Sequence, residues 1–309
     1  MIKIKWLKKL TFNGKHNAFS DLCLFKQTLY CCFREASGHI SDDGVIRILV
    51  LDSDGKVSAK TFIKINNTDL RDPKLTVSPD GKLILLAYAR YFVDDGTRLI
   101  TKNLCWVSQD GLSWSSPTQV GELYWWLWRI RWRDSTAYGF AYNRKANAID
   151  LYQGDPRRSF HNTVPGALSL QKHQLGYPNE SDLVFAGQQC YALVRRDADS
   201  YSAQLGRSTY PFKQWFWHDL NFYVGGPVMH IVDKDTALVA GRVVYQQQVK
   251  TALFKLNLIS GKVSEKLILP SSGDNSYPGL GILEKQLYLS YYSSHEDQQS
   301  AIYLAQITL

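Results

Sequence analysis

Residues 20–34 read Ser-Asp-Leu-Cys-Leu-Phe-Lys-Gln-Thr-Leu-Tyr-Cys-Cys-Phe-Arg, two apolar runs on either side of the polar pair Lys26-Gln27. Short apolar runs that flank a polar turn are typical of a β-hairpin. Similar hairpins begin near five later positions, namely Pro73, Leu127, Ser181, Pro227 and Gly279. Successive starts lie 53, 54, 54, 46 and 52 residues apart. This spacing indicates a repeat of roughly fifty residues.

The repeat predicts an all-β fold. Each hairpin is followed by one or two further strand-like runs, so six repeats of about four strands indicate a six-bladed β-propeller with four-stranded antiparallel blades. The last repeat has only three such runs, and the strand-like segment from Ile2 to Phe12 can supply its fourth and close the ring. A five-bladed propeller, with one repeat misread, is the alternative. We expect a single domain over residues 1–309.

Composition narrows the classes of partner. With 45% hydrophobic residues the chain can bury a sizeable core, and its net charge is +8. Lys and Arg are scattered, so the charge favours a solvated basic surface over a nucleic-acid interface. No segment reaches the ~20 apolar residues of a membrane span, and the N-terminal segment alternates like a strand rather than a signal peptide. We expect a monomer without nucleic acid as partner.

Five cysteines lie within apolar strand patterns: Cys23, Cys31, Cys32, Cys105 and Cys190. An odd number in a long chain argues against a disulfide framework, and free thiols fit a reducing compartment. The spacing of Cys and His indicates no structural metal, and the sequence implies no cofactor.

Three hairpins reach an arginine six residues after their second strand starts, at Arg34, Arg195 and Arg242. The same count in the other repeats gives three tyrosines, Tyr88, Tyr142 and Tyr292. In a propeller blade, the start of the first strand and the end of the second lie on one face near the central axis. We therefore expect the guanidinium groups to surround one site for an anion, most simply a carboxylate.

Other polar and aromatic residues fall near the same strand ends. Acid–base or hydrogen-bonding capacity comes from His16, Asp21, Glu35 and His39, which are therefore candidate substrate-binding residues together with Tyr292. Trp126 offers an aromatic face on which the C–H surface of a sugar can stack.

Residues 108–114, Ser-Gln-Asp-Gly-Leu-Ser-Trp, have the S-x-D-G-x-x-W form of an Asp box. The Asp and Ser can bond the turn backbone, the Gly allows positive φ, and the Trp packs under the turn. This turn is expected between the third and fourth strands of the second repeat. Together with the three arginines, it makes the chain resemble the sialidase (neuraminidase) superfamily.

The resemblance implies a six-bladed propeller whose arginine triad binds a sugar carboxylate, with a Tyr nucleophile assisted by Glu and an Asp acid/base. In this sequence the triad would be Arg34, Arg195 and Arg242. Glu180 precedes Arg195 by fifteen residues, as the family Glu does. Tyr277 opens the sixth repeat, where the family places its tyrosine, and Asp72 opens the second repeat as the best match for the acid/base.

The expected function is that of a retaining exo-glycoside hydrolase acting on an acidic sugar. A phenol with a pKa near 10 needs a base such as Glu180, and a carboxylate nucleophile would be repelled by the carboxylate of such a sugar. Two alternatives stay open. One is a non-catalytic carbohydrate-binding or protein-interaction propeller. The other is a two-carboxylate glycosidase of another propeller family. In this alternative His16, Asp21 and His39 form a separate acid/base set that acts with Asp72 and Glu180.

Overall fold

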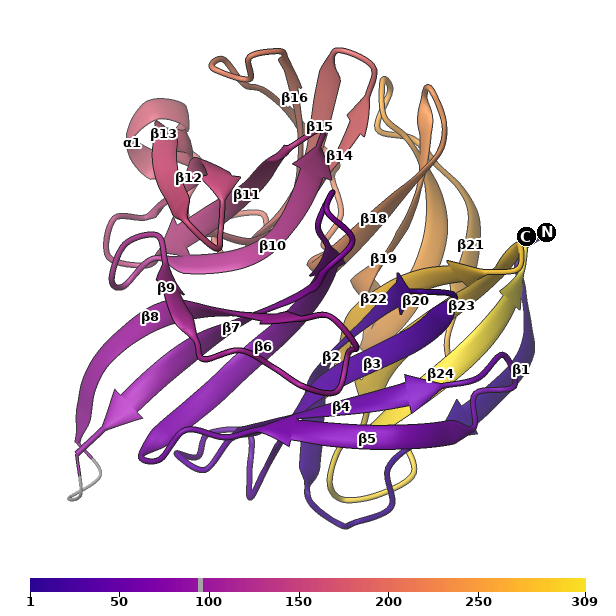
Figure 1. Ribbon diagram of the computed structural model, residues 1–309. Coiled ribbons are helices and arrows are strands. Elements are labelled where there is room, and N and C mark those ends of the chain that lie inside the picture. Colours follow the sequence, from indigo (N-terminus) through magenta and orange to yellow (C-terminus); the bar gives the residue numbers. More distant parts are fainter. Residues whose placement is uncertain (94–96) are drawn as a thin grey trace. The chain divides into compact units, whose positions relative to one another are not determined.

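The structure is a computed structural model that describes residues 1–93 and 97–309. Over these residues the chain forms six four-stranded antiparallel sheets and one short helix, α1 (Leu170–His173). Six such blades make a six-bladed β-propeller, which confirms the prediction from the hairpin repeat (Figure 1). Each predicted hairpin forms the first two strands of one blade.

The blades belong to two compact units. Unit 1 comprises Met1–Tyr124 and Pro270–Leu309, and unit 2 comprises Trp125–Leu269. Each unit contains three blades, so unit 1 is assembled from two separate stretches of the chain. That the whole chain acts as a single domain stays a prediction.

Unit 1 holds the first, second and last blades. The first blade consists of β2 (His16–Phe25), β3 (Thr28–Ala36), β4 (Val45–Leu51) and β5 (Val57–Ile63). The second consists of β6 (Thr68–Val77), β7 (Leu83–Phe92), β8 (Arg98–Ser108) and β9 (Thr118–Val120). The last consists of β22 (Asn275–Leu283), β23 (Gln286–Ser293), β24 (Ala301–Thr308) and β1 (Lys3–Lys9).

The N-terminal strand completes the last blade, as predicted. β1 pairs antiparallel with β24, with Lys3 opposite Thr308 and Lys9 opposite Tyr303. The two ends of the chain therefore lie side by side in Figure 1. β1 covers an edge of β24 that would otherwise be open.

Unit 2 holds the three remaining blades. The third blade consists of β10 (Trp126–Arg133), β11 (Thr136–Asn143), β12 (Ala148–Asp155) and β13 (Ser159–Ser169). The fourth consists of β14 (Pro178–Ala186), β15 (Gln189–Arg196), β16 (Gln204–Thr209) and β17 (Phe216–Asp219). The fifth consists of β18 (Gly225–Asp233), β19 (Thr236–Tyr245), β20 (Gln248–Asn257) and β21 (Val263–Ile268).

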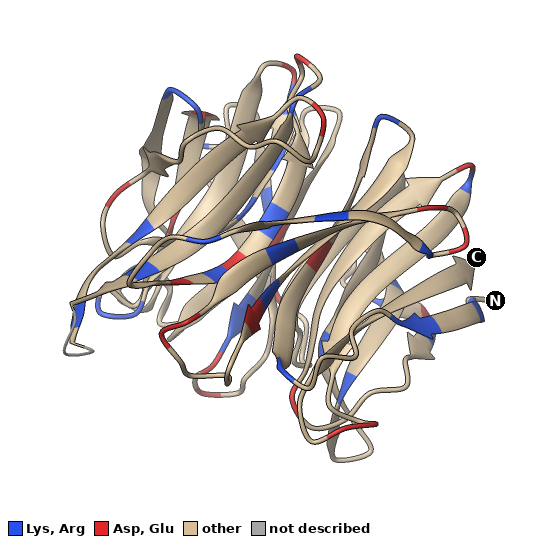
Figure 2. Ribbon diagram, turned by 60° about the horizontal axis from the view of Figure 1, so that its bottom comes forward, with Lys and Arg blue, Asp and Glu red and all other residues tan. Residues whose placement is uncertain are grey.

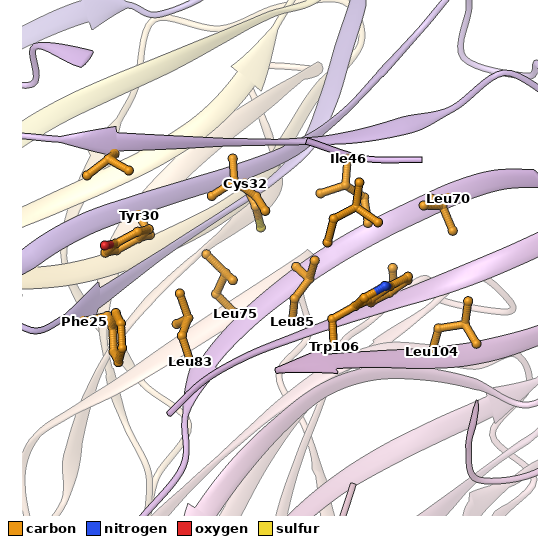
Figure 3. Packing of buried hydrophobic residues seen from close by; sticks show 14 of the residues in the cluster. Phe25, Tyr30, Cys32, Ile46, Leu70, Leu75, Leu83, Leu85, Leu104 and Trp106 are labelled. Carbon is orange, nitrogen blue, oxygen red and sulfur yellow. The ribbon is translucent and has the colours of Figure 1, made fainter. Parts of the chain in front are cut away.

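Apolar side chains of neighbouring blades pack face to face. In unit 1, Tyr30 and Cys32 of the first blade belong to the same buried cluster as Leu83, Leu85 and Trp106 of the second (Figure 3). Alternate residues of β3 and β7 enter this cluster because strand side chains point to opposite faces in turn. The packing holds the inner strands β2 and β6 in place beneath the candidate site.

Every first strand carries a β-bulge at a similar level. The register with the second strand shifts at six places: Ala18/Asp21, Arg71/Lys74, Leu127/Ile130, Pro178/Ser181, Gly225/Val228 and Ser276/Gly279. Three bulges contain a proline, which is tolerated because a bulge interrupts the hydrogen-bond ladder. Phe19, Asp72, Gly226 and Tyr277 adopt positive φ of 61°, 49°, 56° and 42° there. Bulges of this kind redirect side chains and often lie beside active sites.

The predicted equivalence of the three arginines holds for two of them. Arg34 and Arg242 lie opposite Ala18 and Gly225, the last residues before their bulges. In the β14–β15 pair, the residue opposite Pro178 is Arg196. The bulge of β14 lies one residue further from its hairpin turn than the bulge of β2 does from its own turn. Counting six residues from the start of β15 therefore gives Arg195, although the equivalent register position is that of Arg196.

The surface carries both signs of charge. Figure 2 shows Lys and Arg interspersed with Asp and Glu along the strands and turns.

All five cysteines are free. Among the described residues, no helix has the length and apolar character needed to cross a membrane.

Candidate active site

Phe19 is the centre of an aromatic and cationic cluster in unit 1. Its side chain is 2% exposed, and its ring centroid lies 5.4 Å from that of Tyr277 and 5.3 Å from that of His39. The Arg71 guanidinium lies 4.9 Å from the same ring. The positive φ at the β2 bulge turns this side chain toward its neighbours, so the local backbone shape assembles the cluster.

Tyr277, the predicted nucleophile, occupies the corresponding bulge of β22. Its ring is only partly buried, and its backbone carbonyl accepts a hydrogen bond of 2.9 Å from Ser20 Oγ. The buried Lys74 places its ammonium 5.8 Å from the centroid of the phenol ring.

Asp72, the predicted acid/base, lies at the β6 bulge and is buried. Burial lowers the pKa of the adjacent Arg71, but the charges of Asp72 and Asp69 outweigh it and raise that pKa overall. Tyr277 also interacts with this guanidinium electrostatically. Asp72 and Tyr277, predicted from separate repeats, therefore lie around one arginine.

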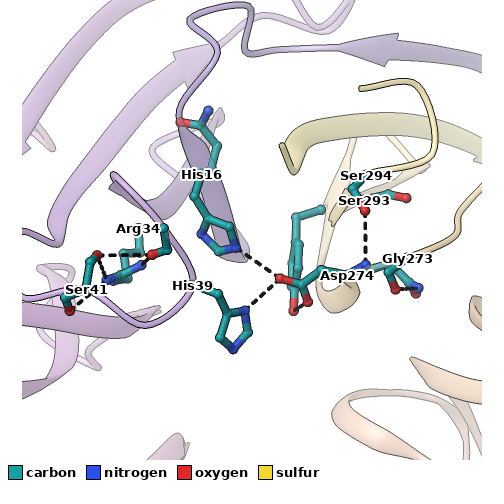
Figure 4. A network of polar contacts seen from close by, with 12 residues as sticks. His16, Arg34, His39, Ser41, Gly273, Asp274, Ser293 and Ser294 are labelled. Atoms are coloured by element: carbon teal, nitrogen blue, oxygen red, sulfur yellow. Dashed lines mark hydrogen bonds and ion pairs between the residues drawn. The ribbon is translucent and has the colours of Figure 1, made fainter. Parts of the chain in front are cut away.

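Arg34, predicted to bind a carboxylate, is instead enclosed by protein. It is 0% exposed, and Nε bonds Asp69 Oδ1 at 2.7 Å. Nη1 donates to Gly38 O at 2.9 Å and Nη2 to Ser41 Oγ at 2.9 Å (Figure 4). Burial lowers the pKa of Arg34, and Asp69 opposes this effect. Arg34 thus anchors the loop of residues 37–44, and Arg71 is the arginine that reaches Tyr277.

The backbone at Gly44 lies against the ion pair of Arg34 and Asp69. A Cβ atom at this position would lie 2.0 Å from Asp69 Oδ1 and 2.5 Å from Arg34 Nε. Only glycine allows the chain to pass so close to the pair. The loop is therefore fixed both by its hydrogen bonds and by the fit of its backbone.

Two histidines converge on one carboxylate at the edge of the Phe19 cluster. His16 Nε2 lies 3.0 Å, and His39 Nδ1 2.7 Å, from Asp274 Oδ2 (Figure 4). Tyr292 Oη donates to Asp274 Oδ1 at 3.0 Å. Burial raises the pKa of Asp274, but these hydrogen bonds outweigh it and hold that pKa well below its usual range. The predicted residues His16, His39 and Tyr292 thus share a single partner.

Asp21 and Glu35 have structural partners elsewhere in unit 1. The buried Asp21 accepts a hydrogen bond of 2.8 Å from Leu75 N, which links the inner strands of adjacent blades. Glu35 follows Arg34 on β3 and so points to the opposite face. It bonds Arg47 Nη2 at 2.8 Å and Lys15 Nζ at 3.4 Å. We do not carry Asp21 or Glu35 into the proposed substrate site.

We expect Glu35→Gln to reduce stability in a pH-dependent way. Burial raises the pKa of Glu35, but its bonds to Arg47 and Lys15 outweigh this and lower it. A lowered folded-state pKa adds stability above the ordinary value of about 4.3, and that stability is lost as pH falls through the folded-state pKa. Urea unfolding should show wild type more stable than Glu35→Gln at pH 7, and this difference should shrink progressively as pH falls below about 4.3. An undiminished difference in acid would contradict this account.

In unit 2, Glu180 lies within the β14 bulge and is buried. Its Oε1 pairs with Arg195 Nη1 at 2.7 Å, and its Oε2 accepts a hydrogen bond of 2.7 Å from Gly226 N. Arg195 Nε also pairs with Asp197 Oδ1 at 2.9 Å. Glu180, predicted as the base that assists Tyr277, is thus held in an ion pair with Arg195, which has Asp197 as an additional partner. Its role as a base stays a prediction.

Tyr223 lies among the arginines of unit 2. The Arg195 guanidinium is 5.6 Å from its ring centroid. Burial raises the pKa of Tyr223 to about 12, against the opposing charges of Arg195 and Arg242. Arg195 and Arg242 thus both interact electrostatically with this phenol. That they bind an anion together stays a prediction.

Trp126 starts β10 and stacks on Tyr142 of the neighbouring strand. The two ring centroids lie 5.5 Å apart with an interplanar angle of 12°. Trp126 is partly exposed, so its aromatic surface is partly accessible. Its role in binding a sugar stays a prediction.

The turn at residues 108–114 joins β8 to β9, the third and fourth strands of the second blade. Asp110 Oδ1 accepts hydrogen bonds from Leu112 N and Ser113 N at 2.8 and 2.7 Å, and Gly111 has φ of 78°. Trp114 packs against the core of the two blades. These contacts give the turn a structural role.

No protein-family model and no curated protein matches the sequence. Among solved structures, a protein of unknown function from Dyadobacter fermentans is similar, with a TM-score of 0.85 and 15% identity over 100% of this chain and 99% of that one. The Hadza microbial sialidase Hz136 gives 0.72 and 12% over 94% of this chain and 65% of its own. Trypanosoma rangeli sialidase gives 0.71 and 9% over 98% and 60%.

The chain has the fold of the sialidases. It spans less than two thirds of the length of Hz136 and of the Trypanosoma rangeli sialidase, and the low identities establish the fold alone. Another structure of the latter enzyme holds 2,3-difluorosialic acid as a covalent intermediate.

The sequence analysis of this sialidase-like propeller missed several residues of the candidate site. Phe19 and Arg71 stand directly before or within their bulges, and Asp274 directly precedes β22. What these residues share in the sequence is their place near the start of the first strand of a blade. Side-chain direction at a bulge could not be predicted from strand alternation, because the bulge interrupts that alternation.

A separate cavity of about 490 Å³ lies in unit 2 of the sialidase-like fold. Its lining includes His218, Phe254 and Lys262. None of its lining residues belongs to the Glu180 cluster described above. The cavity therefore gives no support to the predicted chemistry.

Proposed function

We propose that the protein is a retaining exo-glycoside hydrolase that acts on an acidic sugar. The observation that carries the proposal is the meeting of Tyr277 and Asp72 around Arg71, each at the bulge of an inner strand. This arrangement offers a phenolic nucleophile, a carboxyl group and a guanidinium for an anion within one unit. The sialidase fold supports the same reaction class.

In the proposed first step, Tyr277 Oη bonds the anomeric carbon as the bond to the leaving oxygen breaks. Asp72 gives its proton to that oxygen, and the resemblance to sialidases assigns the phenolic proton to Glu180. In the second step, Asp72 takes a proton from water, which displaces Tyr277, and the phenol regains its proton. Each step conserves protons, and the two steps together return Tyr277, Asp72 and Glu180 to their starting states.

We assign the sugar carboxylate to Arg71, while Arg195 and Arg242 stay predicted anion-binding residues of unit 2. Arg34 serves as a positioning residue, because its three nitrogens bind Asp69, Gly38 and Ser41. This assignment departs from the arginine triad expected from the sequence. It follows from the burial of Arg34 and from the contact of Arg71 with the Phe19 ring.

Covalent trapping tests the proposal. Incubation with 2,3-difluorosialic acid, followed by peptide mass spectrometry, should reveal an adduct on the peptide that contains Tyr277. A parallel panel of fluorogenic sialosides and uronides between pH 4 and 8 should show turnover of at least one substrate. Binding of acidic glycans with neither adduct nor turnover would favour the carbohydrate-binding alternative and reject the hydrolase.

A further inference from the structure

His16, His39 and Asp274 bring three metal-ligating atoms together at the edge of the Phe19 cluster. One nitrogen of each imidazole and one carboxylate oxygen all lie within 4.8 Å of one another. We propose that these residues form a binding site for a divalent transition-metal ion of the zinc class. The site is distinct from the groups assigned to hydrolysis and departs from the expectation of no metal.

The spacing of the three atoms suits such an ion after a small expansion. The two nitrogens lie 3.0 and 2.7 Å from Asp274 Oδ2. Ligands about 2.0–2.2 Å from a tetrahedral zinc ion lie roughly 3.3 Å from one another. The observed hydrogen bonds thus hold each nitrogen a few tenths of an ångström closer to Oδ2 than the ion requires, and the two nitrogens lie within 4.8 Å of each other. A rotation of the loop residue His39 can supply this difference.

The ligand types select the class of ion. Two imidazoles and one carboxylate suit zinc and its neighbours, whereas calcium and magnesium prefer oxygen ligands alone. Three protein ligands leave a position for water or for an oxygen of a bound molecule. The side chain of His39 is 49% exposed, which gives an ion a path from solvent.

Asp274 is already oriented by groups behind it. Tyr292 Oη donates to Oδ1 at 3.0 Å, and Asp274 N donates to Ser294 Oγ at 3.0 Å. The hydrogen bond from Tyr292 holds Oδ1 of the carboxylate in place, so the other oxygen, Oδ2, faces both imidazoles (Figure 4). Partners of this kind, placed behind a ligand, orient metal sites and are worth about 10–100-fold in affinity.

The ligands are far apart in sequence, which explains why their spacing gave no signal. His16 is separated from Asp274 by 258 residues and His39 by 235. Closure of unit 1 brings β2, the loop after β3 and the start of β22 together. The site therefore depends on the fold rather than on a local motif.

Zinc titration of the metal-stripped full chain by calorimetry tests the proposal. We expect one zinc ion per wild-type chain and affinity at least about 10-fold weaker in His39→Ala and Asp274→Asn. Tyr292→Phe should keep the stoichiometry but weaken binding about 10-fold. His161→Ala is the matched control, because this exposed histidine of β13 lies in unit 2. Cobalt loading should give the visible absorption bands of a tetrahedral site in wild type and in His161→Ala, and these bands should be lost in His39→Ala and Asp274→Asn.

Two results would overturn the metal site. One is the absence of zinc binding by the wild type. The other is binding that His39→Ala and Asp274→Asn leave as strong as in His161→Ala, since the ion would then sit elsewhere. Either result would make the cluster a hydrogen-bonded network only. The measurement uses no sugar, so it stands apart from the test of hydrolysis.

Discussion

Asp69→Asn should destabilise the protein by about 3–5 kcal/mol, because it removes the charge that compensates a buried arginine. Asp69 and Arg34 are both 0% exposed and pair at 2.7 Å. Arg71 and Arg90 approach the other carboxylate oxygen at 3.2 and 3.6 Å. With asparagine at position 69, three guanidinium groups would remain close together around a neutral side chain.

Urea unfolding of Asp69→Asn against wild type measures this effect. Asp134→Asn is the control, since Asp134 is 92% exposed and lies 3.9 Å from Arg133. Exposed ion pairs contribute at most about 1 kcal/mol, so the control should remain close to wild type. Equal free energies of unfolding for the two variants would show that Asp69 does not hold the arginine cluster.

Tyr277→Phe should lower kcat by at least about 10³-fold while leaving the binding of an acidic sugar largely intact. The substitution removes the proposed attacking oxygen and keeps the ring that packs 5.4 Å from Phe19 and 5.8 Å from Tyr292. The backbone carbonyl that accepts from Ser20 is also kept. A loss of turnover would therefore report chemistry rather than folding.

The matched control is Tyr201→Phe, which alters an exposed tyrosine of unit 2. Initial rates and the yield of the 2,3-difluorosialic acid adduct should be measured for both variants. The adduct should disappear in Tyr277→Phe and persist in Tyr201→Phe. Substantial turnover by Tyr277→Phe would exclude Tyr277 as the nucleophile, whatever the substrate.

The fold could be predicted from the sequence because the hairpin pattern is visible within short segments and recurs six times. Each hairpin combines apolar runs with a polar turn, and six copies about fifty residues apart leave few architectures. Asp72 and Tyr277 could be selected as candidates because each opens a repeat, where the resemblance to sialidases places the acid/base and the tyrosine. Closure by the N-terminal strand followed from the missing fourth strand of the last repeat.

The side-chain environments could not be predicted in the same way. Arg34 and Arg242 share a register position, yet Arg34 is buried by a loop whose course depends on Gly44 and Asp69. Arg195 lies one residue from the equivalent position because the bulge of β14 is displaced. Asp274 binds groups more than 200 residues away, a distance at which spacing carries no information.

Unit 1 is formed from two separate stretches of the chain, so it cannot fold completely until its C-terminal stretch has been synthesised. Residues 1–124 leave the ribosome first, but β1 has no partner until β24 has been synthesised. Residues 125–269 follow as one uninterrupted stretch with three whole blades, so we expect unit 2 to fold first. Asp274 and Tyr277 emerge only afterwards. A nascent chain thus contains Asp72 before it contains Tyr277, so the proposed active site would be complete only when the last blade has formed.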